Sequence, residues 1–256
     1  MSSTLGIVEV PSTLSRPLAG QAPLPPPAAR RFGDHSVLEW IVRRITESLL
    51  LDQVAVVTDA AQGKTILRLA PPDAAVFISK QPDALSRFAA AIRHYDARQV
   101  VRVPLSSPFV DPELIDRLIG TASANPDSDY IGYATNRGGP AVLSRLGVFT
   151  EWCRAEAILR ADREATRDVD RAKVTRFVYS QPEIFKLRLV PIPPRLDRDD
   201  FRLTVHSEED WDNAHTIFDA LGAEALDWQR IAGLLDQQPA LRERMAVLNE
   251  AERTAH

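Results

Sequence analysis

The segment from Val100 to Asp116 is the part of this 256-residue chain whose residue types and spacing point most directly to chemistry. It starts as an apolar strand, breaks at Ser106 and Ser107, and resumes as a helix pattern after Asp111. Ligands of open α/β sheets bind at the carboxyl ends of the strands, so we expect this turn to lie at a ligand site. Its serines can bind an anion or cap a helix. A magnesium enzyme would need a carboxylate there instead, and the turn itself offers none.

Three other residues could take part in such a site. Arg16 lies in the loop after the first strand, as a phosphate contact or a solvated arginine. Arg102 ends a buried strand, where its charge needs a partner, either a ligand or a structural ion pair. His206 could titrate near neutral pH. Because no nucleophile pattern and no second histidine at metal spacing accompany it, a polar histidine at a strand end is the favoured interpretation.

Strand and helix patterns alternate along the chain, which predicts an α/β fold with a mostly parallel sheet between two layers of helices, a three-layer α/β/α sandwich. The expected strands cover residues 5–10, 53–58, 75–78, 99–103, 129–133, 185–190 and 202–205. The expected helices cover residues 37–49, 83–94, 112–124, 147–161, 167–179 and 208–221, with two further helical patterns after residue 226.

The organisation predicts an α/β domain over residues 1–225 and a helical extension over residues 226–256. Residues 11–33 form a proline-rich loop, in which Pro23–Pro27 favours a polyproline II conformation. A loop of this length inside a domain is usually functional or disordered.

Composition excludes several classes of function. The net charge of −4 gives no electrostatic basis for binding nucleic acid or an anionic membrane. No apolar run reaches the roughly 18 residues that span a bilayer, and the first residues lack a signal-peptide pattern. With Cys153 as the single cysteine, no intrachain disulfide can form. We therefore expect a cytoplasmic protein with neither nucleic acid nor membrane as partner.

An ordered set of segments carries a family resemblance. These are residues 36–40, like "pLLE"; 76–88, like "vfrG…vLdRf"; 102–116, like "RvTgDnPlidpelid"; 133–138, like "tyPrG"; 173–185, like "EHVTpyiy…pe.f"; and 202–210, like "rwTvDtpeDl". Together they resemble the cytidylyltransferase family of spore coat polysaccharide biosynthesis, relatives of the 3-deoxy-manno-octulosonate and acylneuraminate cytidylyltransferases. The resemblance implies a fold of the nucleotide-diphospho-sugar transferase type. It also implies transfer of a nucleotide from CTP to a sugar acid or sugar phosphate, with Mg²⁺ held by two aspartates.

The chain departs from that pattern at the metal positions. Ser106 stands where the first aspartate is expected and His206 where the second is expected, so we predict no metal ligands. A shift of the alignment would offer Asp111 or Asp210 instead. Both lie at helix starts, and helix capping is their favoured role.

The resemblance also assigns binding residues. In the triphosphate loop Ser15, Arg16 and Gly20 echo the family pattern "aRmgSsRLPGKvL", and with Ser106 they form the expected nucleotide site, although the family's lysine is absent. The expected sugar pocket contains Arg137, Gly138, Lys173 and Arg176. The acidic residue that follows "RG" in the family is missing here.

Three hypotheses follow. The chain is a divergent cytidylyltransferase-like protein of glycan or nucleotide-sugar metabolism, with Mg²⁺-dependent transfer impaired or lost. Alternatively, it is an active nucleotidyltransferase with a rebuilt site, the only case that requires Mg²⁺ as cofactor. As a third alternative it is a structural or dimerisation module, with the contact formed between residues 133 and 190. Expected partners are a nucleotide or nucleotide sugar, a second copy of the chain, or an active relative.

Overall fold

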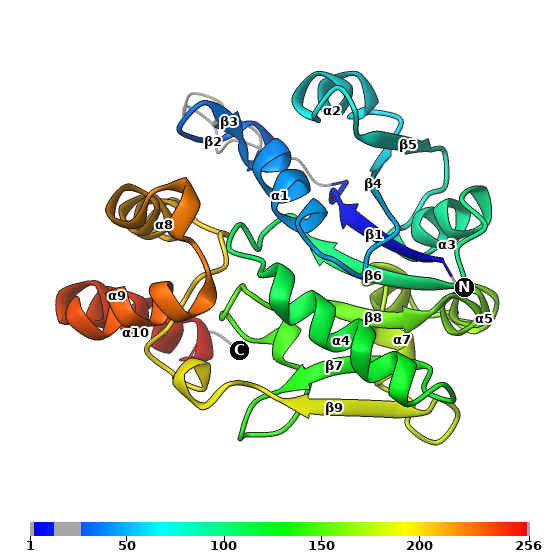
Figure 1. The fold of residues 1–256 in the computed structure, drawn as a ribbon. Coiled ribbons are helices and arrows are strands. Elements are labelled where there is room, and N and C mark those ends of the chain that lie inside the picture. The colour runs from blue at the N-terminus through cyan, green and yellow to red at the C-terminus, as the bar shows by residue number, and fades with distance from the viewer. Residues whose placement is uncertain (1–2, 13–26, 255–256) are drawn as a thin grey trace.

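The computed structural model describes residues 3–12 and 27–254, and within these ranges its centre is a seven-stranded sheet (Figure 1). The strands are β1 (Thr4–Glu9), β4 (Gln53–Asp59), β5 (Ala75–Ser79), β6 (Gln99–Pro104), β7 (Tyr130–Ala134), β8 (Glu151–Arg154) and β9 (Leu187–Pro191). Their order is β5-β4-β1-β6-β8-β7-β9. All neighbours pair in parallel except β8, which is antiparallel to both β6 and β7. The predicted α/β class with a mostly parallel sheet is confirmed.

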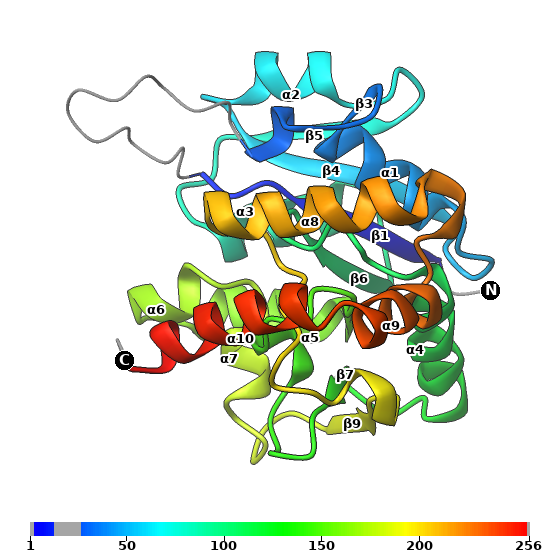
Figure 2. The same cartoon turned by 90° about the vertical axis from the view of Figure 1, so that its left-hand side faces the viewer.

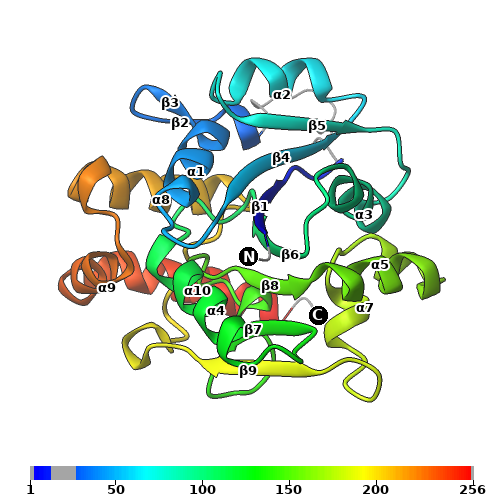
Figure 3. The ribbon, with the colours of Figure 1, turned by 45° about the vertical axis from the view of Figure 1, so that its right-hand side comes forward.

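Helices cover both faces of this sheet, as Figure 3 shows. One face carries α1 (Val37–Thr46) and α4 (Pro112–Ala124), and the other carries α3 (Ala84–His94) and α5 (Ala155–Glu164). Alternate strand residues supply the two cores, because successive side chains of a strand point to opposite faces. Val101 packs with the α1 and α4 side, whereas Val100 packs with the α3 and α5 side.

Smaller elements complete the described chain. They are the 3₁₀ turns η1 (Pro27–Ala29), η2 (Ala141–Leu143), η3 (Pro194–Leu196) and η4 (Ala223–Ala225), the short helices α2 (Gly63–Leu69), α6 (Asp168–Arg171) and α7 (Arg176–Tyr179), and the two-stranded ladder of β2 (Arg31–Phe32) and β3 (His35–Ser36).

Three long helices end the chain, namely α8 (Glu208–Leu221), α9 (Trp228–Gln237) and α10 (Pro239–Thr254). Figure 2 looks onto the edge of the sheet where the parallel strands end, and α8 and α10 cross in front of it. The C-terminal helices therefore lie over the edge at which ligands of open α/β sheets bind. Among the described residues, no helix combines the length and apolar character needed to cross a membrane.

The prediction of one helix over residues 147–161 was wrong. Residues 151–154 form β8, and α5 begins only at Ala155. Trp152 packs into one core and Cys153 into the other, so this short segment is buried on both faces. The helix pattern of α5 extends back into residues 151–154, but the pairing of these residues with β6 and β7 makes them a strand.

Three other expectations differ from the structure, and two small elements were not expected. Residues 167–179 form the two short helices α6 and α7 instead of one helix. The first helix stops at Thr46, and Leu49 beyond it is 88% exposed. Residues 202–205 form no strand, and the helix α2 and the ladder of β2 with β3 were not predicted.

The C-terminal helices share the main hydrophobic core. Ile231, Leu235 and Met245 are buried in the same cluster as Ile115 of α4 and Phe149 before β8. The division of the chain at residue 225 stays a prediction, and this shared burial supports an extension that packs on the domain and does not fold apart from it.

Leu235→Ala tests this cooperation. We expect the free energy of unfolding to fall by about 2–5 kcal/mol in a single transition, because the change leaves a cavity in the shared core. Val247→Ala on α10 is the control: Val247 is 63% exposed, so its loss should change the free energy by no more than about 0.5 kcal/mol. Two transitions in urea, with only the weaker one moved by Leu235→Ala, would contradict the shared core.

Candidate functional site

The two positions that lack metal carboxylates lie side by side at the carboxyl edge of β6. Ser106 follows this strand directly, and the backbone N–H of Val205 donates to the carbonyl oxygen of Ser106 at 2.8 Å. His206 comes next in the chain, immediately before the start of α8. The structure thus brings Ser106 and His206 together, as the resemblance implied.

Asp111 does not supply the missing carboxylate, because α4 uses it as its N-terminal cap. It accepts hydrogen bonds from the backbone N–H groups of Glu113 and Leu114, and from that of Trp228 at 2.9 Å. Burial raises the pKa of Asp111 despite these bonds. The capping role predicted for Asp111 is confirmed.

Asp210 also caps a helix, at the start of α8, and so does not supply the missing carboxylate either. It forms a capping box with Ser207 and accepts the backbone N–H of His206 at 3.0 Å. Its carboxylate also pairs with the guanidinium of Arg202, with an Nε–Oδ1 distance of 2.5 Å. The predicted capping role is confirmed, and Asp210 fixes the turn that carries His206.

Two arginines and the carboxylate of Asp210 lie near His206 and act on its charge in opposite senses. Desolvation by the surrounding atoms, followed by the repulsion of nearby Arg145, lowers the pKa of His206 to about 4, with Arg202 acting in the same sense. The imidazole is therefore neutral at pH 7. Mg²⁺ prefers hard anionic oxygen ligands, and a neutral hydroxyl with a neutral imidazole beside two arginines does not match that preference. Among the residues that the structure describes, no group of three His, Cys, Asp or Glu side chains could hold a metal ion.

A buried network of charges crosses the sheet just before this edge. Arg102 of β6 pairs with Glu9 of β1 at 2.6 Å and with Glu151 of β8 at 2.8 Å. Glu151 also accepts hydrogen bonds from the hydroxyl groups of Tyr130 and Thr175, each at 2.8 Å. Burial alone would lower the pKa of Arg102, but the two carboxylates hold it above its usual value. Of the two roles considered for Arg102, the structural ion pair is the one observed.

Glu9 and Glu151 were not among the predicted site residues. Glu9 is an isolated acid at the end of an apolar strand, a signal that could have identified it because a buried acid must be paired. Glu151 lies in a segment for which a helix was predicted, so it carried no such signal.

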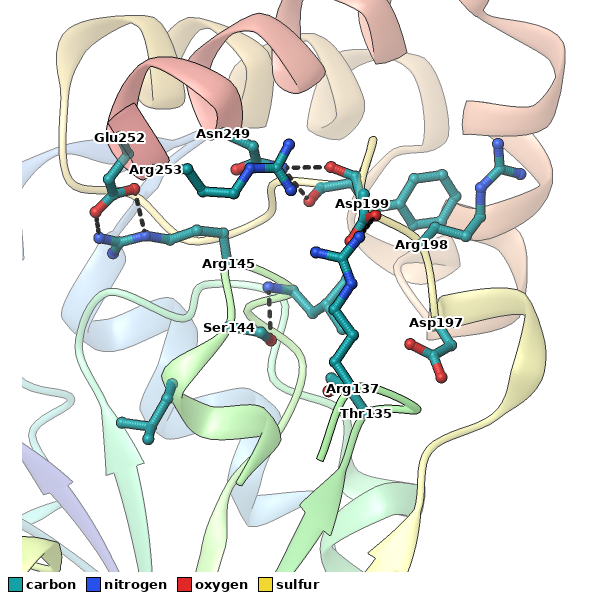
Figure 4. A pocket seen from close by; sticks show the side chains of 13 residues that line it. Thr135, Arg137, Ser144, Arg145, Asp197, Arg198, Asp199, Asn249, Glu252 and Arg253 are labelled. Carbon is teal, nitrogen blue, oxygen red and sulfur yellow. Dashed lines mark hydrogen bonds and ion pairs between the residues drawn. The ribbon is translucent and has the colours of Figure 1, made fainter. Parts of the chain in front are cut away.

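A polar pocket of about 560 Å³ lies between the strand ends and α10 (Figure 4). We call it the Arg137 pocket. Its described lining residues are Thr135, Arg137, Leu143, Ser144, Arg145, Leu146, Asp197, Arg198, Asp199, Phe201, Asn249, Glu252 and Arg253.

Ion pairs and a hydrogen bond connect helix α10 to the residues on the opposite side of this pocket. Glu252 of α10 accepts from Nε of Arg145 at 2.8 Å and from Arg202 at 2.8 Å. Asn249, also on α10, donates to the carbonyl oxygen of Asp199 at 2.8 Å. Arg145 faces both regions, since it lines the pocket and also lowers the pKa of His206.

The four expected sugar-pocket residues do not share one pocket. Arg137 lines the Arg137 pocket and pairs with Asp199. Gly138 lies in the adjoining turn, where its positive φ of 81° suits glycine. Lys173 is exposed. Arg176 pairs with Asp170 at 3.1 Å, and neither of these two basic residues lines the pocket. Ser15, Arg16 and Gly20 lie outside the described residues.

Comparisons with known proteins agree with this architecture. The family model of the cytidylyltransferases matches residues 24–251. The spore coat polysaccharide biosynthesis protein SpsF of Bacillus subtilis is 25% identical over 210 residues, which is 79% of this chain and 84% of SpsF.

Two solved structures share the fold. A cytidylyltransferase from Leptospira borgpetersenii superposes with a TM-score of 0.73 at 18% identity, over 94% of this chain and 95% of that one. A CMP:2-keto-3-deoxy-manno-octonic acid synthetase in complex with CTP superposes with a TM-score of 0.62 at 9% identity, over 86% of this chain and 99% of that one.

The mostly parallel sheet with helices on both faces defines an α/β protein with the fold of these solved cytidylyltransferases. Within that class the chain belongs to the cytidylyltransferase family, whose members serve nucleotide-sugar metabolism.

Removing Glu151 tests the buried network. Glu151→Ala removes one of the two carboxylates that pair with the buried guanidinium of Arg102. Breaking a buried pair in this way lowers the free energy of unfolding by about 3–5 kcal/mol. Denaturation in urea measures the change.

The control for this variant is Glu156→Ala, which removes an acid paired with Arg163 at the surface and should cost no more than about 1 kcal/mol. Equal effects of the two substitutions would show that the network contributes no more than a surface pair.

Proposed function

We propose that this protein binds a nucleotide or a nucleotide sugar at the carboxyl edge of its sheet and has lost Mg²⁺-dependent nucleotidyl transfer. The observation that carries the proposal is the pair Ser106 and His206, held side by side where the family's two aspartates are expected. CTP is the ligand of a structural neighbour with this fold, which makes CTP the first nucleotide to test.

The charge of the triphosphate is the reason that nucleotidyl transfer in this family needs a metal ion. In a metal-dependent transfer, Mg²⁺ aligns the reacting phosphate and takes up charge as pyrophosphate leaves. Neither Ser106 nor His206 is anionic at pH 7, and Asp111 and Asp210 are already used as helix caps. Arg145 and Arg202 lie beside His206, paired with the carboxylates of Glu252 and Asp210. Arginines can donate hydrogen bonds to an anionic nucleotide, but they would not supply the charge stabilisation that a bound metal would give to the leaving pyrophosphate.

Two alternative functions differ in what they require. An active enzyme with a rebuilt site would need Mg²⁺ for tight binding of CTP. A structural or dimerisation module, whether as a homodimer or as a partner of an active relative, would need no nucleotide.

Calorimetry with CTP separates these functions. We expect binding whose dissociation constant is the same with Mg²⁺ and with EDTA to within about twofold, or roughly 0.4 kcal/mol. Tight binding only in the presence of Mg²⁺ would overturn the proposal in favour of the active enzyme. The absence of binding to CTP and to the other nucleoside triphosphates would favour the structural module.

Restoring both carboxylates is the complementary test. The double variant Ser106→Asp with His206→Asp places two anionic oxygens at adjacent positions, so we expect CTP binding to become Mg²⁺-dependent. The change is measured by titrating Mg²⁺ at fixed CTP, with pyrophosphate release as a second readout. The matched control replaces both residues with Asn, which has the shape of Asp without its charge. A folded Asp variant that responds to Mg²⁺ no more than the Asn variant would show that these positions no longer form a metal site.

A further inference from the structure

We propose that helix α2 of one copy of this chain docks into a groove between α8 and α10 of a second copy, in a weak head-to-tail contact. The inference goes beyond the proposed function and does not rest on it, because neither surface contains Ser106, His206 or a residue of the Arg137 pocket. It also differs from the contact expected between residues 133 and 190, since α2, α8 and α10 all lie outside that segment.

The groove between α8 and α10 carries an excess of negative charge. It has a volume of about 480 Å³, and the carboxylates of Glu209, Asp212 and Glu243 line it. None of these three acids forms an ion pair within the described part of the chain. One cation accompanies them, Arg244, whose Nε donates to Oδ1 of Asn213 at 3.3 Å.

The α10 side of the groove is also apolar. Ala240, Val247 and Leu248 line it, and Val247 is 63% exposed. Residues 240, 243, 244 and 247 have the spacing of a single helix face, so the exposed valine and the carboxylate of Glu243 are presented together. Such a surface fits an apolar side chain that is flanked by cations.

Helix α2 presents that complementary pattern on its outer face. Lys64, Leu67 and Arg68 are exposed, Leu67 by 54%, and their spacing of three and four residues puts them side by side. Ile66 is buried and holds the opposite face of α2 against the domain. Among the described residues neither cation pairs with a carboxylate, and Nε of Arg68 donates to the carbonyl oxygen of Lys64 at 3.2 Å.

The two surfaces agree in length. The seven residues of α2 extend over about 10 Å, and residues 240–248 of α10 over about 12 Å, at roughly 1.5 Å per residue. With Leu67 packed on Val247, a cation on each side of the leucine can meet the acids of the two groove walls, Asp212 on α8 and Glu243 on α10. The contact would neutralise charges on both surfaces that have no partner within one described copy.

One copy cannot bring these two surfaces together. Figures 1 and 2 show α2 beside β5 at one side of the sheet, and α8 and α10 across the strand ends, well away from it. A contact between two different surfaces is heterologous, so successive copies add to one another and form a ring or an open chain. Because a helix of seven residues gives an interface well below the standard size, we expect a dissociation constant on the order of 100 µM.

Sedimentation of the full chain without nucleotide tests the association. Between about 10 and 300 µM protein in low salt, we expect the weight-average mass to rise above the 28.4 kDa of one copy. Raising NaCl to about 500 mM should return the mass toward that of one copy, because salt screens contacts between exposed charges.

Two charge-reversed variants identify the surfaces. Lys64→Glu with Arg68→Glu makes α2 acidic, and Asp212→Lys with Glu243→Lys makes the groove basic. Each variant alone opposes like charges, so its dissociation constant should rise by about tenfold or more. An equimolar mixture of the two should associate again, because the acidic α2 of one variant meets the basic groove of the other and the unchanged surfaces also match.

The matched control is Arg98→Glu with Arg163→Glu, which reverses two exposed cations outside both surfaces. It should associate as the unchanged chain does, and circular dichroism of every variant should show the native fold. The inference is wrong if the unchanged chain stays monomeric at 300 µM in low salt. It is equally wrong if both charge-reversed variants still associate, if their mixture stays monomeric, or if the control loses association to the same extent. None of these results bears on CTP binding, which tests the proposed function separately.

Discussion

The buried ion network centred on Arg102 is the interaction on which the site end of the sheet depends. A guanidinium inside an α/β sheet is tolerable only if carboxylates and hydrogen bonds compensate its desolvation. Glu9 and Glu151 provide that compensation from the strands on either side of β6. The pairing therefore fixes the register of β1, β6 and β8 at the end of the sheet that carries the loops of the site.

The same network explains the antiparallel strand β8. Glu151 is the first residue of β8 and is fully buried, and it receives hydrogen bonds from β7 through Tyr130 and from the segment before α7 through Thr175. An acid at this place is satisfied only when the segment enters the sheet between β6 and β7. Sequence periodicity could not reveal this, since the four residues of β8 run straight into a stronger helix pattern. The parallel strands β1, β4 and β6 were predictable because each is a mainly apolar run flanked by turn residues.

The candidate site was predictable in part, for reasons that differ between residues. The caps Asp111 and Asp210 follow from local spacing, because a cap and its helix lie within four residues of each other. The proximity of Ser106 and His206 followed only from the family resemblance, as no local pattern links positions so far apart. The Arg137 pocket could not be predicted from the sequence, because Asn249, Glu252 and Arg253 line it only through the packing of α10 over the strand ends. For the same reason Arg176 was grouped with Arg137, although Asp170 holds it elsewhere.

Charge connects these observations. A family site with two aspartates attracts a divalent cation, which in turn attracts the triphosphate. Here both aspartate positions are neutral, Asp210 is bound to Arg202, and Glu252 of α10 neutralises Arg145 and Arg202 from the opposite side. The carboxylates of Asp210 and Glu252 are thus already engaged by arginines, and a metal ion at this edge would have to compete with the guanidinium groups for them. Positions 106 and 206 and the ion pairs of Arg145 and Arg202 therefore act in the same direction against a bound metal, since the former bring no carboxylate and the latter occupy the carboxylates nearby.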